Sequence, residues 1–278
     1  MQVWVDSLCK KLGYILISCL ISTGISAQAL PIESFHPQEE LHMRLYFKWG
    51  LLMAKAGETS ISMKESQYQG KPAWKYRLLF KTQGMFEKIY SMRDTMDSYF
   101  SKGNGLLLFG NKHVNEKGYY LIDEWTFSYS NAKTAIHSKR YTPTKIKIDT
   151  TLVTENKTYD MLSATLFLRS LDWNNLTLEE AVPFHIAIGK DLISVAFRYT
   201  GQEVIERDNM KYRTRHFYID IYDEAFTQSK ASGEAWIGDD PNHIPIRIRA
   251  KLKIGAAEVY YESAQNLKYP LSCRVPIH

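Results

Sequence analysis

The chain has 278 residues, of which 45% are hydrophobic and 23% charged, and its formal net charge is +5. These values are ordinary for a folded globular protein, and they exclude a disordered or collagen-like chain. Lysines and arginines are interspersed with acids and form no long basic block, which argues against nucleic acid as a partner.

The first 27 residues are predicted to form a secretory signal peptide. Lys10 and Lys11 precede an apolar stretch from Leu12 to Ile25, which is shorter than the ~20 residues that a membrane-spanning helix needs. Small residues then frame a cleavage site between Ala27 and Gln28. We therefore expect an exported protein, located in the periplasm or at the outer envelope, with no transmembrane helix in its mature form.

A second processing route would tether the protein to a membrane. The sequence Leu16-Ile17-Ser18-Cys19 resembles a lipobox, in which the cysteine is acylated and becomes the first residue. We favour removal of the whole signal, because the stretch stays apolar beyond Cys19, whereas a lipoprotein normally continues into a polar tether. Removal would leave Cys273 as the single thiol, so no intrachain disulfide is expected.

Residues 28–278 are predicted to form a single β-rich domain. Alternation of apolar and polar residues, which is typical of a strand with one buried face, begins at Leu41 to Trp49. Short turns rich in Gly, Asn and Pro separate the strands that follow, which favours antiparallel pairing. Further strands are predicted over Gly57–Ser66, Pro72–Thr82, Asp94–Phe100, Leu106–Lys117, Tyr119–Tyr129, Lys133–Tyr141 and Thr144–Asp149.

Two segments are predicted to be helical. Gly84 to Tyr90 would form one short turn, and Asp160 would cap a longer helix over Met161 to Leu171. No linker rich in Pro, Gly or Ser accompanies the longer helix, which favours one domain on both sides of it. After it, strands are predicted over Val182–Ile188, Leu192–Tyr199, Gln202–Glu206, Tyr212–Tyr222, Gly233–Gly238, Pro245–Ile254 and Ala257–Ser263.

Four groups of segments share their order and spacing with one known family. They are Tyr46–Gly50 with Ala54–Glu58, Ile89–Asp94, Tyr159–Arg169, and Trp236–Asp240 followed by Ile244–Ile246 and Ile254–Gly255. They resemble the domain-of-unknown-function 3108 family of exported bacterial proteins. The resemblance implies a mainly β fold, with a single large, strongly curved antiparallel sheet or open barrel, and it implies no activity. Such sheets look like those of periplasmic lipoprotein carriers, whose concave apolar face is covered by helices; this likeness is an analogy of fold.

The familiar catalytic motifs are missing from the sequence. There is no Gly-x-Ser-x-Gly elbow, no His-Glu-x-x-His, no phosphate-binding glycine loop and no paired cysteines. The eight histidines are far apart, so we expect no metal site, and nothing indicates a cofactor. The protein is accordingly expected not to be an enzyme.

Three charged residues are candidate anchors, either for a ligand or for the fold. Arg169 is the one charged residue of the predicted helix, which is made mostly of Met, Leu, Ala and Phe, so it needs a partner if it is buried. Asp94 and Asp160 are the predicted partners. A structural ion pair is favoured over an anchor for a ligand.

Two further charged segments have both a structural and a binding interpretation. The four basic residues between Arg247 and Lys253 alternate with apolar ones, which predicts a solvated strand face, with contact to phosphate or an acidic glycan as the alternative. The segment Asp239-Asp240-Pro241-Asn242 predicts a β-turn between two strands, with calcium binding as the alternative.

The leading hypothesis is a non-catalytic binding or structural protein of the cell envelope. It would hold a hydrophobic or amphipathic ligand, such as a lipid, or an envelope protein partner, on the concave face of the curved sheet. The alternative is a carboxylate-based hydrolase that acts on envelope glycan or peptide. That activity needs two neighbouring carboxylates, for which Asp94, Asp97 and the pair Asp123-Glu124 are candidates.

Overall fold

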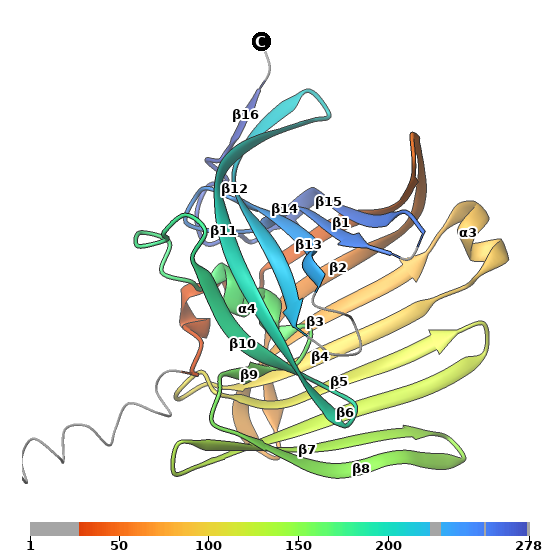
Figure 1. Ribbon diagram of the computed structural model, residues 1–278, viewed down its shortest axis with the longest axis vertical. Helices are drawn as coiled ribbons and strands as arrows, with labels where there is room; N and C mark the ends of the chain where they lie inside the picture. Colours follow the sequence, from red (N-terminus) through yellow and green to blue (C-terminus); the bar gives the residue numbers. More distant parts are fainter. Residues whose placement is uncertain (1–27, 223–228, 253, 277–278) are drawn as a thin grey trace, which may run out of the picture.

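The computed structural model describes residues 28–222, 229–252 and 254–276 (Figure 1). The predicted signal peptide, including Cys19, lies outside these residues. The strands are β1 (Glu40–Trp49), β2 (Leu52–Tyr68), β3 (Lys71–Thr82), β4 (Arg93–Ser101), β5 (Leu107–Glu116), β6 (Tyr119–Ser130), β7 (Lys133–Thr142), β8 (Lys145–Thr154), β9 (Thr158–Tyr159), β10 (Ala181–Ile188), β11 (Asp191–Arg207), β12 (Met210–Tyr222), β13 (Ser229–Gly238), β14 (Pro245–Lys251), β15 (Ala256–Gln265) and β16 (Arg274–Pro276). The helices are the 3-10 turn η1 (Ile32–Ser34), α3 (Gly84–Ile89) and α4 (Ser163–Arg169).

The described strands form one sheet that curves into an incomplete barrel. Neighbouring strands follow the order β8-β7-β6-β5-β4-β3-β2-β1-β15-β14-β13-β12-β11-β10-β9, and β16 pairs with β12. The pairs are antiparallel except β9 with β10, which is parallel. The prediction of one large, curved antiparallel sheet or open barrel with one or two short helices is confirmed.

Two meanders of hairpins make up this sheet. The first wing runs from β1 to β8, and the second runs from β10 to β15, so most strand pairs join segments that are close in the sequence. The wings meet where β1 pairs with β15, for example at Leu41 and Ala264. This long-range pairing turns two separate meanders into one curved surface.

The seam between the outer edges of the two wings is bridged by side chains. β8 and β9 end the order of hydrogen-bonded strands and do not pair with each other. Gln28 lies between the wings, where its side chain donates to the carbonyl of Thr158 (2.7 Å) and accepts from the hydroxyl of Thr134 (3.1 Å). Ser138 on β7 also donates to the carbonyl of Gly189 in the β10–β11 turn. These contacts hold the barrel nearly closed without a continuous ladder.

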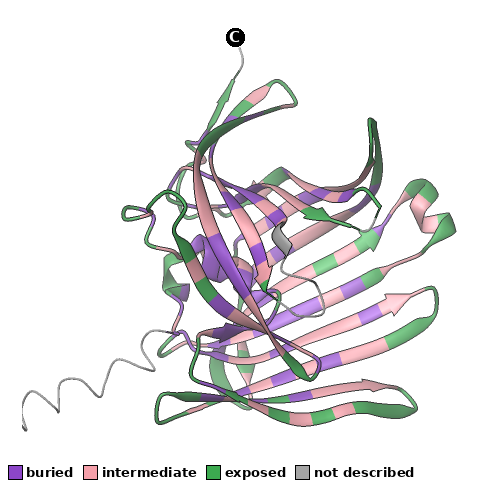
Figure 2. Cartoon of the chain, viewed as in Figure 1, coloured by how far each residue is buried: buried purple, intermediate pink, exposed green. Residues whose placement is uncertain are grey.

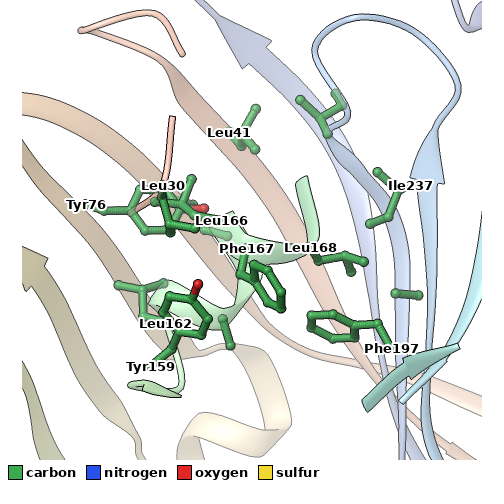
Figure 3. Close-up of a cluster of buried hydrophobic side chains, with 14 of the residues drawn as sticks. Leu30, Leu41, Tyr76, Tyr159, Leu162, Leu166, Phe167, Leu168, Phe197 and Ile237 are labelled. Carbon is green, nitrogen blue, oxygen red and sulfur yellow. The ribbon is translucent and has the colours of Figure 1, made fainter. Parts of the chain in front are cut away.

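The helix α4 lies inside the curve of the sheet, in the space that we call the lumen (Figures 1 and 3). Leu162 and Leu166 pack with Leu41 and Tyr76 of the first wing, while Phe167 and Leu168 face Phe197 and Ile237 of the second (Figure 3). Figure 2 shows α4 as one of the most buried parts of the chain. Because a helix of seven residues is unstable in isolation, the packing of both wings around it keeps it folded.

Several element boundaries differ from those predicted. The central helix is shorter than Met161–Leu171, and β9 and β16 were not predicted. β11 is continuous where two strands were predicted, because a bulge at Gly201, with φ of 124°, bends the strand without ending it. The short helix predicted near Gly84 is present as α3.

We predict that removing a buried side chain of α4 destabilises the whole barrel. Leu166 is fully buried, so Leu166→Ala should lower the free energy of unfolding by about 2–5 kcal/mol, measured by urea denaturation. Leu178→Ala is the matched control, because Leu178 is largely exposed, and it should change stability by less than about 1 kcal/mol. Equal losses in the two variants would contradict a core centred on α4.

Candidate functional site

A buried ion pair fixes the carboxyl end of α4. The guanidinium of Arg169 donates two hydrogen bonds to the carboxylate of Glu39, at 2.6 and 2.9 Å, and both side chains are almost fully buried. Burial alone would lower the pKa of Arg169, but the charge of Glu39 outweighs it, and the pKa is raised. Arg169 is therefore a permanent cation inside the protein.

Arg169 also connects α4 to two other segments. Its guanidinium donates to the carbonyl of Asn242 in the β13–β14 turn (2.9 Å) and lies 4.6 Å from the ring centroid of Phe35. Its own carbonyl accepts from the indole of Trp173 at 3.2 Å. The predicted structural ion pair exists, but the partner is Glu39, so the prediction that Asp94 or Asp160 neutralises Arg169 is wrong.

Asp160 fixes the amino end of α4. Its carboxylate accepts hydrogen bonds from the amides of Leu162 (2.8 Å) and Ser163 (2.7 Å), and from the hydroxyl of Ser98 on β4 (2.8 Å). It thus caps the helix, as predicted, and binds it to the first wing. A Cβ at Gly110 on β5 would collide with this carboxylate, so glycine is required there. Burial raises the pKa of Asp160 to about 6.

Asp94 lies apart from these two anchors. It is on β4, four residues before Ser98, so the period of two places both side chains on the lumen face. Its carboxylate accepts a hydrogen bond from the amide of Asn115 at 3.1 Å, and burial raises its pKa. The structure therefore places Asp160 and Arg169 at opposite ends of α4. The hydrogen bond of Asp94 is to β5, and it does not pair with Arg169.

An apolar pocket lies in the lumen beside α4. Its volume is about 170 Å³, and its walls come from both wings and from the helix. Ile61 and Tyr76 belong to the first wing, Ile219 and Ile248 to the second, and Leu168 to the helix. Few polar atoms reach the wall: the hydroxyl of Tyr76 lies 3.3 Å from that of Thr165, and Arg169, whose Nε has no hydrogen-bond partner within the described residues, also lines the pocket. The pocket thus presents a hydrocarbon surface.

The lumen changes from apolar to charged along a single row of paired residues. The row begins with Ile61 on β2, which pairs with Leu78, and continues through Met96 on β4. It then reaches three charged residues on successive strands, in the order Lys112 on β5, Asp123 on β6 and Arg140 on β7. Arg140 and Asp123 form a two-bond ion pair at 2.5 and 3.1 Å. The lumen wall is therefore amphipathic.

A second, more polar groove of about 540 Å³ opens at the seam. It lies where the β6–β7 turn and the segment after β8 approach β10 and β11. Lys133, Glu155, Lys157 and His185 are among the side chains that line it. Phe184 borders both this groove and the apolar pocket, so the two spaces adjoin.

The other charged residues considered from the sequence have structural partners. Asp97 accepts two hydrogen bonds from Arg77, at 2.6 and 2.8 Å, and the ammonium of Lys75 lies 3.2 Å from the same carboxylate. Glu124 accepts from the hydroxyl of Tyr141 at 3.0 Å. These carboxylates are held in cross-strand pairs on the sheet.

The basic row of β14 is paired with acids of the adjacent strands. Arg247 lies 3.0 Å from Glu258 and Arg249 lies 3.1 Å from Glu234, while Lys253 is outside the described residues. The predicted solvated face is therefore wrong at Arg247 and Arg249, which are half-buried and ion-paired, whereas Lys251 is exposed as predicted.

The acidic segment after β13 forms the predicted turn. Asp239 pairs with Arg215 at 2.8 Å, and Asp240 accepts from the amides of Asn242 (2.9 Å) and Cys273 (3.1 Å). These carboxylate oxygens thus hold the turn and the carboxyl-terminal segment. Within the described ranges, no group of three His, Cys, Asp or Glu side chains is arranged to hold a metal ion.

Comparison with known proteins fits this architecture. Residues 42–262 match the family described as "Protein of unknown function (DUF3108)". The chain belongs to this family. The resemblance seen in the sequence is thereby confirmed over most of the barrel. No curated protein matches the chain.

One solved structure with a similar fold is a β-barrel-like protein of domain of unknown function DUF1849 from Brucella abortus. Its TM-score is 0.56 at 7% sequence identity, and the match covers 83% of this chain and 98% of that one. At this identity the likeness concerns the fold alone. This DUF3108 chain therefore shares a barrel-like architecture with a protein of very different sequence.

Glu39 and the pocket were missed by the sequence reasoning. Glu39 is two residues before Leu41, so the alternation of β1 already places its side chain on the buried face. The burial of Glu39 could therefore have been predicted from this alternation. The pocket had none, because its walls come from strands of both wings that meet only in the folded barrel.

We predict that the ion pair of this DUF3108 protein matters chiefly because a lone buried charge is costly. Arg169→Met should lower the free energy of unfolding by about 3–5 kcal/mol, since it leaves Glu39 buried without a cation. The double variant with Glu39→Leu should recover much of that loss. As a control, Lys133→Met breaks the exposed pair with Glu155 and should cost at most about 1 kcal/mol. Failure of the double variant to recover stability would contradict this account.

We also predict a pH dependence from Asp160. Its pKa of about 6 in the folded state exceeds the ordinary value of 3.8, so the folded state binds the proton more tightly. Its contribution to stability is therefore greatest below about pH 4 and is lost as the pH rises through 6. The stability that is lost amounts to about 3 kcal/mol, because a shift of one pKa unit corresponds to about 1.4 kcal/mol.

The variant Asp160→Asn isolates this effect, because it keeps an acceptor oxygen and removes the titration. The free energy of unfolding of the native protein, minus that of the variant, should fall between pH 4 and pH 7 in urea denaturation. A difference that stays constant, or rises, with pH would show that the carboxyl is not the titrating group.

Proposed function

We propose that this DUF3108 protein is a non-catalytic binding protein that holds the apolar part of an amphipathic ligand in its lumen beside α4. We further propose that it does so in the periplasm or at the outer envelope, after removal of residues 1–27. The observation that carries the proposal is the apolar pocket between the two wings, because hydrocarbon surface in a folded interior is normally covered by packed side chains.

The volume of the pocket defines what can enter it. At about 170 Å³ it is close to the ~150 Å³ cavity that accepts a benzene-sized molecule, and it is smaller than sites for whole drug-sized ligands. It therefore suits one end of an apolar chain or a single ring. The exposed side chain of Met161 lies at the border of the pocket, so a ligand can enter the pocket from the rest of the lumen.

The charged part of the lumen suits a ligand with a polar end. Lys112, Asp123 and Arg140 follow the apolar residues on the same row, so a molecule lying along that row would contact both kinds of surface. Within the described part of the chain, Lys112 makes no ion pair, whereas Asp123 and Arg140 bind each other. Lys112 is the side chain of the row best placed to meet a polar ligand group.

Arg169 lines the pocket, and in this proposal it supports the fold while Glu39 balances its charge. Its guanidinium already donates to Glu39 and to the carbonyl of Asn242. Hydrolysis by paired carboxylates gains no comparable support, because Asp97 and Asp123 are each held by an arginine.

We predict that filling the pocket abolishes binding of an apolar probe. Ile248 lines the pocket at a half-buried position, so Ile248→Trp would occupy the space with an indole. Binding of cis-parinaric acid, followed by its fluorescence, should weaken at least tenfold. The matched control is Leu79→Trp, an exposed position on the outer face of β3, which should leave binding unchanged.

Circular dichroism and urea denaturation of each variant establish that the barrel is intact. Binding that is unchanged in folded Ile248→Trp, or absent from the native protein, would contradict the proposed function. Equal weakening in Leu79→Trp would place the probe on the outer surface of the sheet.

A further inference from the structure

We propose that one end of the barrel docks on a lipid bilayer that contains anionic head groups. The docking surface is an apolar rim made of three adjacent segments, namely the β1–β2 turn, the helix α3 and the β14–β15 turn. This inference goes beyond the proposed ligand binding and does not depend on it. The large side chains of the rim are Trp49, Leu51, Leu52, Met53, Met85, Ile89, Tyr90, Leu252 and Ile254.

The three segments lie side by side at one end of the molecule (Figure 1). Lys48 pairs with Ala256, which brings the β1–β2 turn next to the β14–β15 turn. Gly255 has φ of 74°, and a Cβ there would collide with the carbonyl of Lys48. On the other side, the ring of Phe86 in α3 lies 6.3 Å from that of Phe47. The rim is therefore one continuous structural feature.

The rim exposes its apolar side chains to an unusual degree. The exposed fractions are 103% for Leu51, 73% for Met85 and 67% for Ile254. Isolated apolar residues are common on protein surfaces, but gathered ones mark sites of contact with proteins or membranes. Nine large apolar residues on three neighbouring segments form such a gathering.

The charges around the rim indicate an anionic partner. Lys55, Lys88 and Lys251 are exposed and make no ion pair within the described part of the chain. Two of the acids nearby are paired with bases, since Glu58 binds Lys81 at 2.6 Å and Glu87 binds Arg93 at 2.7 Å, and Glu116 accepts a hydrogen bond from the hydroxyl of Tyr90 at 2.6 Å. Free lysines beside exposed hydrocarbon match a surface in which anionic head groups cover an apolar interior.

The form of the rim favours a bilayer over a protein partner. Its apolar side chains stand on separate turns, and a fluid bilayer admits separate tips without the shape complementarity that a protein interface needs. Trp49 and Tyr90 are also the residue types that concentrate at the boundary between head groups and acyl chains.

The position of Trp49 allows a direct test. Trp74, Trp125, Trp173 and Trp236 are buried, so Trp49 is the one exposed tryptophan within the described residues. We would titrate the protein with vesicles of phosphatidylcholine and 30% phosphatidylglycerol that carry brominated acyl chains, which quench tryptophan on contact. The quenching that results from contact at the rim is the difference between the quenching of the native protein and that of the Trp49→Phe variant.

We expect anionic vesicles to quench Trp49. We also expect the double variant Leu51→Glu/Ile254→Glu to bind vesicles at least tenfold more weakly than the native protein. The double variant Lys55→Glu/Lys88→Glu should bind anionic vesicles more weakly and should bind vesicles of pure phosphatidylcholine as the native protein does. The controls are Leu178→Glu, 62% exposed in the segment between α4 and β10, and Val204→Glu, 53% exposed on β11, and both should bind as the native protein does.

Two results would overturn the proposal. One is that Trp49 remains unquenched while the protein binds vesicles, which would place the contact elsewhere. The other is that the native protein ignores vesicles but forms a dimer in light scattering that Leu51→Glu abolishes, which would make the rim an interface between two copies.

Discussion

The burial of α4 inside the curved sheet is the constraint on which the rest of the structure depends. Each wing is a meander of hairpins with one apolar face, and α4 covers part of the apolar face of the first wing and part of that of the second. The helix is too short to be stable alone, so helix and barrel stabilise each other. Asp160 and Arg169 fix its two ends through buried polar contacts with β4, with Glu39 and with the β13–β14 turn.

The lumen follows from this arrangement. Since α4 has only seven residues, it fills one part of the space between the wings and leaves the apolar pocket beside it. The strands that face the pocket carry aliphatic side chains, whereas β5 to β7 carry charges at the same level of the sheet. A molecule lying along this row would contact both apolar and charged surface, which is the proposed basis for amphipathic ligand binding.

Much of the fold could be predicted from local patterns, because alternation and turn chemistry act over a few residues. Leu41 to Trp49 shows this, as its alternation marks both a strand and its buried face. The bulge at Gly201 could not be predicted in this way, since a glycine between two alternating runs also suits a turn. The partner of Arg169 is Glu39, 130 residues away in the sequence, so local spacing does not reveal that the two side chains meet.

In the proposed function, the lumen of this DUF3108 protein holds the apolar part of an amphipathic ligand. Native mass spectrometry of protein purified from its own cells, followed by organic extraction, tests it most directly. We expect a complex whose extra mass is released on extraction as an amphipathic molecule, and we expect Ile248→Trp not to retain that molecule. Native protein that is consistently free of any such mass, or a ligand that Ile248→Trp retains in full, would contradict it.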